Sequence, residues 1–219
     1  MRLFVGIPAF DRKLTCETAR SLLLTQGAAS LAGIEFDVCF APGSSLITHA
    51  RNHVVRDFLA SGADRLVFVD ADIAWDGIEL IKLASHQRDF VGGVYRHKNP
   101  TETYPINWID RPELWSDASG LIEVARLPTG FLSLSRSVFE SIEAAHPERK
   151  PYAFGDGTFY PYFHIPPGLG EDYAFCDDWR AAGGEIWLDP SLTLTHVDGA
   201  QKYTGCIGDW LRSRMKEAA

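Results

Sequence analysis

The chain has 219 residues, of which 46% are hydrophobic and 23% are charged, and its formal net charge is −8 at pH 7. This length suits one α/β domain with a full-sized hydrophobic core, and no apolar run reaches the length of a membrane span. An acidic chain without clusters of Lys and Arg is a poor partner for phosphate backbones, so we exclude nucleic-acid binding.

The amino terminus and the cysteines bear on the compartment in which the protein works. The first residues carry one positive charge and a short apolar stretch without the cleavage site of a signal peptide. We therefore expect a cytoplasmic protein, with peripheral attachment to a membrane left open. The four scattered cysteines form no C-x-x-C pair, which predicts free thiols rather than a zinc site or a disulfide framework.

The first hundred residues alternate segments typical of strands with segments of helical periodicity. Strands are predicted over 2–7, 34–40, 65–69 and 90–95, and helices over 15–26 and 45–61. Thr15 is a candidate N-cap, Gly62 is a candidate C-terminal stop, and Asp76 with Glu79 forms a capping box before a further helix. Strands that alternate with helices imply parallel pairing and a doubly wound sheet.

The second half of the chain is less regular. Strands are predicted over 104–109, 121–126 and 131–135, and a helix follows Ser135. Residues 147–170 are rich in Pro, Gly and aromatic residues, and a loop this long inside a compact domain is usually functional. A helix over 172–182, two short strands and a helix from 207 complete the chain, and no linker divides it into two domains.

The segment Asp70-Ala71-Asp72 directly follows the apolar run 65–69. Side chains at positions i and i+2 of a strand point the same way, so Asp70 and Asp72 are expected to project together at the carboxyl end of this strand, where α/β sheets bind ligands. Two such carboxylates repel each other unless a cation lies between them, and a hard divalent ion fits. The alternative reading, that they are turn or helix-cap aspartates, stays open.

Two segments carry a resemblance to a known family. Thr48-His49-Ala50-Arg51-Asn52-His53, followed by Leu66-Val67-Phe68-Val69-Asp70-Ala71-Asp72-Ile73, resembles the nucleotide-sugar-dependent glycosyltransferases of the GT-A fold, of the bacterial and phage family 2-like type, with some likeness to Anp1-type mannosyltransferases. The resemblance covers nearly the whole chain. It implies a Rossmann-like, mostly parallel central sheet flanked by helices, with a small antiparallel extension in the second half. Residues 1–219 would form one domain, with a nucleotide-binding half (1–100) and an acceptor-binding half (101–219).

The resemblance also implies a metal site. Asp72 would bind the metal, and Asp70 would contact the ribose, the metal or both. His196, in the run Leu194-Thr195-His196-Val197-Asp198-Gly199, matches a position where similar enzymes carry a further metal ligand. Imidazole beside carboxylate favours Mn²⁺, with Mg²⁺ as the other candidate. The competing interpretation of His196 is a hydrogen-bonded structural histidine at a strand end.

The nucleotide-sugar contacts implied by the resemblance come from several turns and one helix. The candidate residues are Pro8, Ala9, Arg51, Asn52, Asp70, Lys98, Thr129 and Gly130. Several have a plainer alternative: Pro8 as a strand terminator, Arg51 as a solvent-exposed helical residue, and Gly130 as part of an ordinary turn. Lys98 or Arg96 would neutralise the phosphate, and the alternative for both is an exposed surface charge.

Glu171-Asp172, before the last large helix, resembles the acidic pair of these enzymes. Transfer with inversion needs a base that takes the proton from the acceptor hydroxyl, and a neighbouring carboxylate can raise the pKa of such a base. By resemblance, Asp172 is the candidate base, and Glu171 positions it or binds the acceptor. The alternative is that Asp172 only caps the helix.

These features predict a metal-dependent glycosyltransferase of the hexosyltransferase type (EC 2.4). It would move a sugar from a UDP- or GDP-sugar to a glycan, a lipid-linked acceptor or another hydroxyl acceptor. The acidic pair suggests inversion, whereas Anp1-type relatives retain the configuration. Two alternatives remain: a sugar nucleotidyltransferase, whose Gly-rich basic loop has no counterpart at residues 8–13, and a non-catalytic subunit that binds a nucleotide sugar or a glycan.

Overall fold

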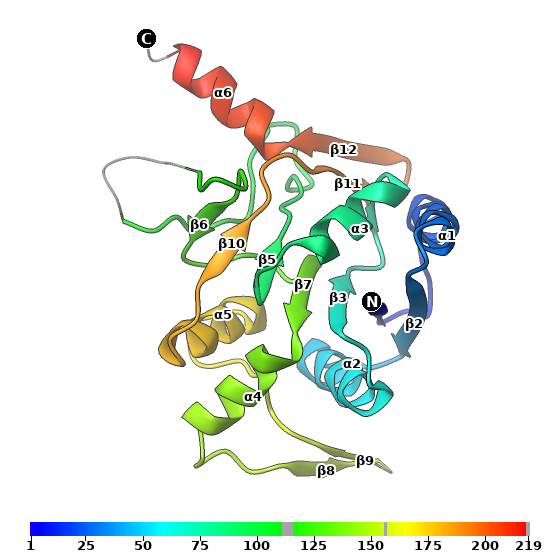
Figure 1. The fold of residues 1–219 in the computed structure, drawn as a ribbon, viewed down its shortest axis with the longest axis vertical. Helices are drawn as coiled ribbons and strands as arrows, with labels where there is room; N and C mark the ends of the chain where they lie inside the picture. Colours follow the sequence, from blue (N-terminus) through cyan, green and yellow to red (C-terminus); the bar gives the residue numbers. More distant parts are fainter. Residues whose placement is uncertain (111–115, 156, 218–219) are drawn as a thin grey trace.

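The computed structural model describes residues 1–110, 116–155 and 157–217 and is built around one mixed sheet (Figure 1). Within these residues the strand order is β2-β1-β3-β7-β5-β10-β6. The strands are β1 (Arg2–Ala9), β2 (Glu35–Pro42), β3 (Arg65–Val69), β5 (Phe90–Gly92), β6 (Ile122–Val124), β7 (Phe131–Ser135) and β10 (Ile186–Leu188). β6 and β7 run against the other strands of this sheet, so the prediction of a mostly parallel central sheet is confirmed.

Helices cover both faces of this sheet, as Figure 1 shows. They are α1 (Cys16–Leu31), α2 (Ile47–Ser61), α3 (Gly77–Ser85), α4 (Arg136–Ala145), α5 (Glu171–Ala181) and α6 (Ile207–Glu217). Alternate residues of β1 face opposite sides: Phe4 packs in one core with α2, α4 and α5, and Leu3 packs in the other with α1 and α3. α2 approaches β1 closely because Gly6 has no side chain, and a Cβ there would collide with Val54.

Local sequence signals set the helix ends. The Thr15 hydroxyl accepts a hydrogen bond from the Thr18 backbone N–H at 3.1 Å, so Thr15 is the N-cap of α1. α2 ends at Gly62, whose φ of 72° is in the left-handed region that glycine adopts most easily. Asp76 and Glu79 form the capping box of α3. All three predictions are confirmed.

A small antiparallel sheet carries one predicted site residue. It has the order β12-β11-β4, with β4 (Ile73–Ala74), β11 (Thr193–Asp198) and β12 (Gln201–Cys206). This confirms the predicted antiparallel extension, although β12 was not expected. His196 pairs with Ile73, and the Val197 N–H donates to the Asp72 carbonyl oxygen at 2.9 Å. The pairing therefore brings His196 beside Asp72.

Two sequence predictions differ from the structure in the second half. The strand expected over 104–109 is replaced by an isolated bridge between Asn107 and Arg126, because Pro105 has no N–H to give to a ladder. The segment 147–170, expected to be irregular, contains the hairpin of β8 (Tyr152–Phe154) and β9 (Gly157–Phe159). Asp156 in this hairpin lies outside the described residues.

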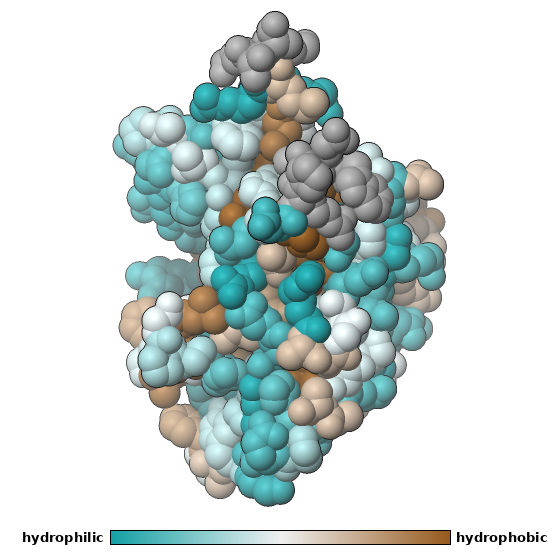
Figure 2. Space-filling model, turned by 90° about the vertical axis from the view of Figure 1, so that its left-hand side faces the viewer, coloured by the Kyte–Doolittle hydropathy of each residue, from teal (hydrophilic) through white to brown (hydrophobic). Residues whose placement is uncertain are grey.

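The surface and the thiols agree with the composition. Figure 2 shows a largely hydrophilic face on which hydrophobic side chains occur in small patches. In the described part of the chain, every helix is too short or too polar to cross a membrane. The four cysteines are free, as predicted.

Candidate functional site

The two aspartates of the Asp70-Ala71-Asp72 segment lie in a turn rather than on a strand. β3 ends at Val69, and the Ile73 N–H donates to the Asp70 carbonyl oxygen at 3.1 Å, which closes the turn. The strand rule that placed both side chains on one face was therefore wrong. Because the backbone reverses direction here, Asp70 and Asp72 have different partners.

The Asp70 carboxylate is surrounded by polar partners. Arg51 Nη2 is 3.2 Å from Oδ1, and the Tyr95 hydroxyl donates to Oδ2 at 3.2 Å. The Asp70 N–H donates to the Gly130 carbonyl oxygen at 3.0 Å, and a Cβ at Gly130 would collide with this carboxylate and with the Tyr95 hydroxyl. Gly130 therefore allows close packing around Asp70, in addition to forming the turn that was its alternative interpretation.

Arg51 joins the two acidic segments of the sequence. It is 4% exposed, and its Nε is 3.5 Å from Glu171 Oε1 at the start of α5. Burial would lower the pKa of Arg51, but the negative charges of Asp70 and Glu171 outweigh it and raise the pKa. The alternative of a solvent-exposed helical arginine is thus wrong, since Arg51 is a buried cation between two carboxylates.

Asp72 faces His196 and Lys98. Lys98 Nζ is 2.7 Å from Asp72 Oδ2, and His196 Nε2 is 3.4 Å from the same oxygen. Burial would raise the pKa of Asp72, but hydrogen bonds with His196 and Lys98 outweigh it and lower the pKa. Asp72 is therefore ionised at neutral pH and surrounded by groups that stabilise its charge.

The tautomer of His196 bears on whether a metal fits. His196 Nδ1 is 2.8 Å from the Arg96 carbonyl oxygen, which can only accept, so Nδ1 carries the proton. When the ring is protonated at both nitrogens, Nε2 donates the hydrogen bond to Asp72 described above. In the neutral ring, Nε2 directs its lone pair towards Asp72 instead, and two electron-pair donors face each other. A cation between them resolves this arrangement, which fits a carboxylate–imidazole metal site with a hydrogen-bonded histidine.

The protein supplies few ligands to such a metal. In the described residues, no group of three or more His, Cys, Asp or Glu side chains is arranged to hold an ion. Asp70, predicted as a third ligand, has Arg51 and Tyr95 as its partners instead. Asp72 and His196 would leave most coordination positions to phosphate oxygens and water, which is how Mg²⁺ is commonly held in phosphoryl sites.

Asp70 and Asp72 line a cleft of about 860 Å³ at the carboxyl end of β3, together with Arg51, Tyr95 and His196. Its wall includes Pro8, Phe10, Asp11, Lys13, Leu14, Thr15, Ser44, Ser45, Ile47, Ala50, Arg51, Asp70, Ala71, Asp72, Tyr95, His196 and Gly199. The volume suits a ligand larger than a monosaccharide. Three other clefts formed by the described residues do not combine carboxylates, an imidazole and a guanidinium in one wall.

The acidic pair lies at the amino-terminal end of α5. The N-cap of α5 is Gly170, so the interpretation of Asp172 as the helix cap is wrong. Burial, and then the neighbouring charge of Glu171, raise the pKa of Asp172. A carboxylate with a raised pKa holds a proton more readily than a surface aspartate, which suits a general base.

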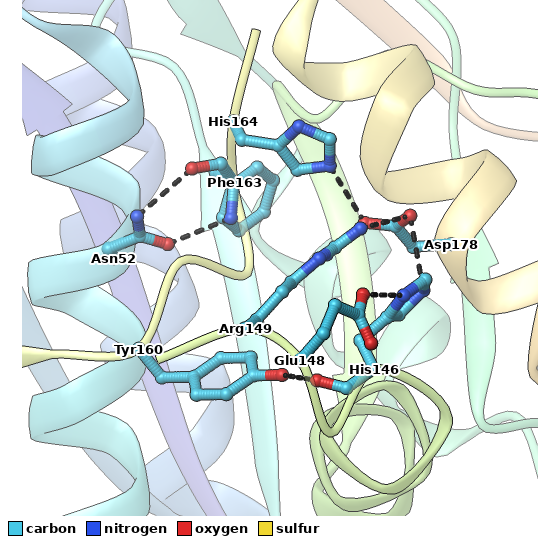
Figure 3. A network of polar contacts seen from close by, with 8 residues as sticks. All are labelled: Asn52, His146, Glu148, Arg149, Tyr160, Phe163, His164 and Asp178. Carbon is cyan, nitrogen blue, oxygen red and sulfur yellow. Dashed lines mark hydrogen bonds and ion pairs between the residues drawn. The ribbon is translucent and has the colours of Figure 1, made fainter. Parts of the chain in front are cut away.

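Asn52 is buried beside the aromatic segment that follows α4. It is 2% exposed, its Nδ2 donates to the Phe163 carbonyl oxygen at 3.0 Å, and its Oδ1 accepts from the Phe163 N–H at 2.8 Å (Figure 3). Both amide atoms are used in holding the aromatic segment, so Asn52 positions this segment, and its contact with a nucleotide stays a prediction. Phe163 in turn stacks on Phe175 of α5, with ring centroids 4.3 Å apart.

A second polar network fixes the same segment to α5. Asp178 accepts two hydrogen bonds from Arg149, at 2.6 and 2.8 Å, and one from His164 Nε2 at 3.0 Å (Figure 3). The Tyr160 hydroxyl donates to the His146 carbonyl oxygen at 3.1 Å. The segment that follows α4 is therefore anchored at both the α2 and the α5 side.

The remaining predicted residues fall into two groups. Pro8 lines the cleft, and Lys98 contacts Asp72. Ala9 and Thr129 are buried outside the cleft wall; the Ala9 carbonyl oxygen accepts from the N–H groups of Arg12 and Gly43 and so shapes the turn after β1.

Tyr95 is a site residue that sequence reasoning missed. It is 8% exposed, donates to Asp70, and packs its ring edge-on against His196 with centroids 4.9 Å apart. Tyr95 thereby connects the Asp70 pocket with the Asp72–His196 pair. In the sequence, only its position just after Gly92-Gly93, at the end of β5, pointed to a role in the site.

Comparisons with known proteins agree on the fold. No family model and no curated protein sequence matches the chain. Among solved structures, A197 from STIV has a TM-score of 0.56 and 19% identity, covering 90% of this chain and 86% of that one. S. aureus TarS in complex with UDP-GlcNAc has a TM-score of 0.50 and 13% identity over 86% of this chain and 56% of that one. GalNAc-T7 with UDP, GalNAc and Mn²⁺ has a TM-score of 0.51 and 12% identity over 90% and 44%.

The chain has the GT-A fold. In a GT-A fold, as in other open α/β sheets, ligands bind outside the carboxyl ends of the parallel strands, and the cleft around Asp70 and Asp72 lies there. The narrower likeness to Anp1-type mannosyltransferases stays a prediction.

Proposed function

We propose that this protein is a glycosyltransferase that moves a sugar from a nucleoside-diphosphate sugar to a hydroxyl acceptor. The observation that carries the proposal is the single cleft in which Asp72 and His196 face each other while Arg51 links Asp70 to Glu171. The cleft offers a place for a cation and a charged anchor, and the acidic pair joined to it through Arg51 adds a basic carboxylate. A metal-dependent, inverting transfer from a nucleotide sugar uses these three elements.

Different residues of the cleft would bind the ribose, the metal ion and the nucleoside. Arg51 and Tyr95 hold Asp70 in one orientation, and its side chain remains 28% exposed, so it can accept a hydrogen bond from the ribose. Asp72 and His196 would hold Mn²⁺ or Mg²⁺, which supplies positive charge for the departing diphosphate. Pro8 offers an apolar surface to the nucleoside.

Asp172 supplies the base in this proposal. Its carboxylate takes the proton of the acceptor hydroxyl as the oxygen attacks the anomeric carbon, and the nucleoside diphosphate leaves from the opposite side. Glu171 is held by Arg51 and keeps a negative charge beside Asp172, which supports the raised pKa. This geometry corresponds to inversion at the anomeric carbon.

A UDP-sugar is the first donor to test. Two structures that share the fold were determined with UDP-GlcNAc, or with UDP, GalNAc and Mn²⁺. We extend these ligands to this chain as a proposal and place its reaction in the hexosyltransferase class. GDP-sugars are the second set, and a glycan or a lipid-linked sugar is the acceptor class to include.

The experiment measures release of nucleoside diphosphate from a panel of UDP- and GDP-sugars with Mn²⁺ or Mg²⁺. We expect release with at least one donor, and loss of release in Asp72→Asn and Asp172→Asn. Asp209→Asn is the matched control, because Asp209 is 75% exposed and pairs only with Arg212 on the surface of α6 among the contacts described. Release that is equal in all four proteins would refute the site.

Two further measurements separate the alternatives. A nucleotidyltransferase would form pyrophosphate from a nucleoside triphosphate and a sugar phosphate. A binding subunit would bind a donor, seen as a rise in Tm by mass action, without turnover. Either result in place of diphosphate release contradicts the proposal.

A further inference from the structure

Lys98 holds the position that a metal ion would need on Asp72. Its Nζ is 2.7 Å from Asp72 Oδ2, the oxygen that also faces His196 Nε2 at 3.4 Å. The side chains of Lys98 and Asp72 are 33% and 32% exposed, so the pair is open to solvent, and Asp72 lines the cleft. An ammonium at hydrogen-bond distance and a divalent ion cannot share one carboxylate oxygen without repelling each other.

One short segment touches both candidate metal ligands. After β5 the chain turns, with the His97 N–H donating to the Thr103 carbonyl oxygen at 3.0 Å. This turn presents the Arg96 carbonyl oxygen to His196 Nδ1 and, two residues later, the Lys98 ammonium to Asp72. The turn therefore orients His196 through the backbone and neutralises Asp72 through a side chain.

The stem of lysine allows the ammonium to move while this turn stays in place. Lysine carries its charge on a flexible four-carbon chain, and its ammonium donates without a fixed direction. The Arg96 side chain, in contrast, is tied to the Thr204 and Pro100 carbonyl oxygens. Lys98 can thus leave Asp72 without disturbing the contact that sets the His196 tautomer.

We propose that Lys98 is an internal counter-ion that competes with the divalent metal for Asp72 and transfers to the diphosphate when metal and nucleotide bind together. Without nucleotide, the metal must displace the ammonium into water, so its affinity is weak. With nucleotide, the phosphate oxygens accept the ammonium, and metal and nucleotide strengthen each other's binding. The transfer to diphosphate rests on the proposed function; the competition for Asp72 does not.

The experiment measures the affinity for Mn²⁺ alone, by the electron paramagnetic resonance signal of free Mn²⁺, in wild-type protein and in Lys98→Gln. We expect Lys98→Gln to bind Mn²⁺ roughly tenfold more tightly without nucleotide. Lys13→Gln is the matched control, because Lys13 lines the same cleft but pairs with Asp11, at 3.3 Å. It should leave the affinity nearly unchanged. Lys98→Met, which keeps the stem and lacks the charge, repeats the test.

Addition of UDP completes the test. UDP should increase the Mn²⁺ affinity of the wild type more than that of Lys98→Gln, because only the wild type has an ammonium to transfer. Equal Mn²⁺ affinity in Lys98→Gln, Lys98→Met and the wild type overturns the competition. An equal gain of Mn²⁺ affinity in Lys13→Gln also overturns it, because the effect would then come from the change in net charge alone. These readouts need no donor sugar and no turnover, so failure of the proposed transfer reaction remains distinguishable from failure of this inference.

Discussion

Replacing Arg51 by Gln removes the cation that lies between Asp70 and Glu171. The side chains of Arg51, Glu171 and Asp70 are 5%, 17% and 28% exposed. Removal of one partner from a buried ion pair costs about 3–5 kcal/mol of unfolding free energy, and the partial exposure of Asp70 favours the lower end, about 3 kcal/mol. For a protein of this size the Tm should fall by roughly 6–12 °C.

Urea unfolding of Arg51→Gln, with Arg212→Gln as control, measures this effect. Arg212 pairs with Asp209 on the surface, with side chains 68% and 75% exposed, so its loss should change stability by at most about 0.5 kcal/mol. In a double-mutant cycle with Glu171→Gln, we expect a coupling energy above about 0.5 kcal/mol. If Arg51→Gln is as stable as the control variant, the buried bridge does not link α2 to α5.

Three further predictions concern the cleft and the aromatic segment. In Gly130→Ala the new methyl group collides with the Asp70 carboxylate, so diphosphate release should fall by roughly 10²-fold; unchanged release contradicts the role of this close packing. Asn52→Ala loses both hydrogen bonds to the Phe163 backbone, so it should cost about 2 kcal/mol and speed limited proteolysis after α4; an unchanged digestion rate speaks against the anchor. Burial would raise the pKa of Asp178, but hydrogen bonds from Arg149 outweigh it and lower the pKa. The ionised carboxylate therefore stabilises the fold above its unfolded pKa of about 3.9, and this stabilisation is lost as the pH falls through the folded pKa. The stability gap between wild type and Asp178→Asn should therefore narrow below about pH 4 in urea titrations, and a gap that widens on acidification opposes this assignment.

Local signals predicted most of the fold. The apolar run 65–69 matches β3, and Thr15, Gly62 and Asp76 act at the helix ends as their residue types suggest. The order of strands β10 and β6 at one edge could not be read, because it depends on which segments meet in space. β12 was missed since its residues, Gln201–Cys206, are mostly polar and exposed on a hairpin that alternation does not mark.

The sequence predicted the identity of the site residues better than their contacts. Arg51, Asp70, Asp72 and His196 do line one cleft, as the resemblance implied. Their partners depend on a turn at 70–73 and on the depth at which α2 packs, and neither follows from spacing along the chain. Hence the sequence did not predict that Arg51 bridges to Glu171 or that Asp70 has Arg51 and Tyr95 as its partners.

Crystals grown with UDP and Mn²⁺ would locate the ion and the nucleotide in the cleft, through the anomalous scattering of manganese. We expect a manganese peak in contact with Asp72 and His196, with the diphosphate bound to the same ion and the uridine extending past Asp70 towards Pro8. Manganese or nucleotide bound away from this cleft, or bound there without contact to Asp72, would contradict the account.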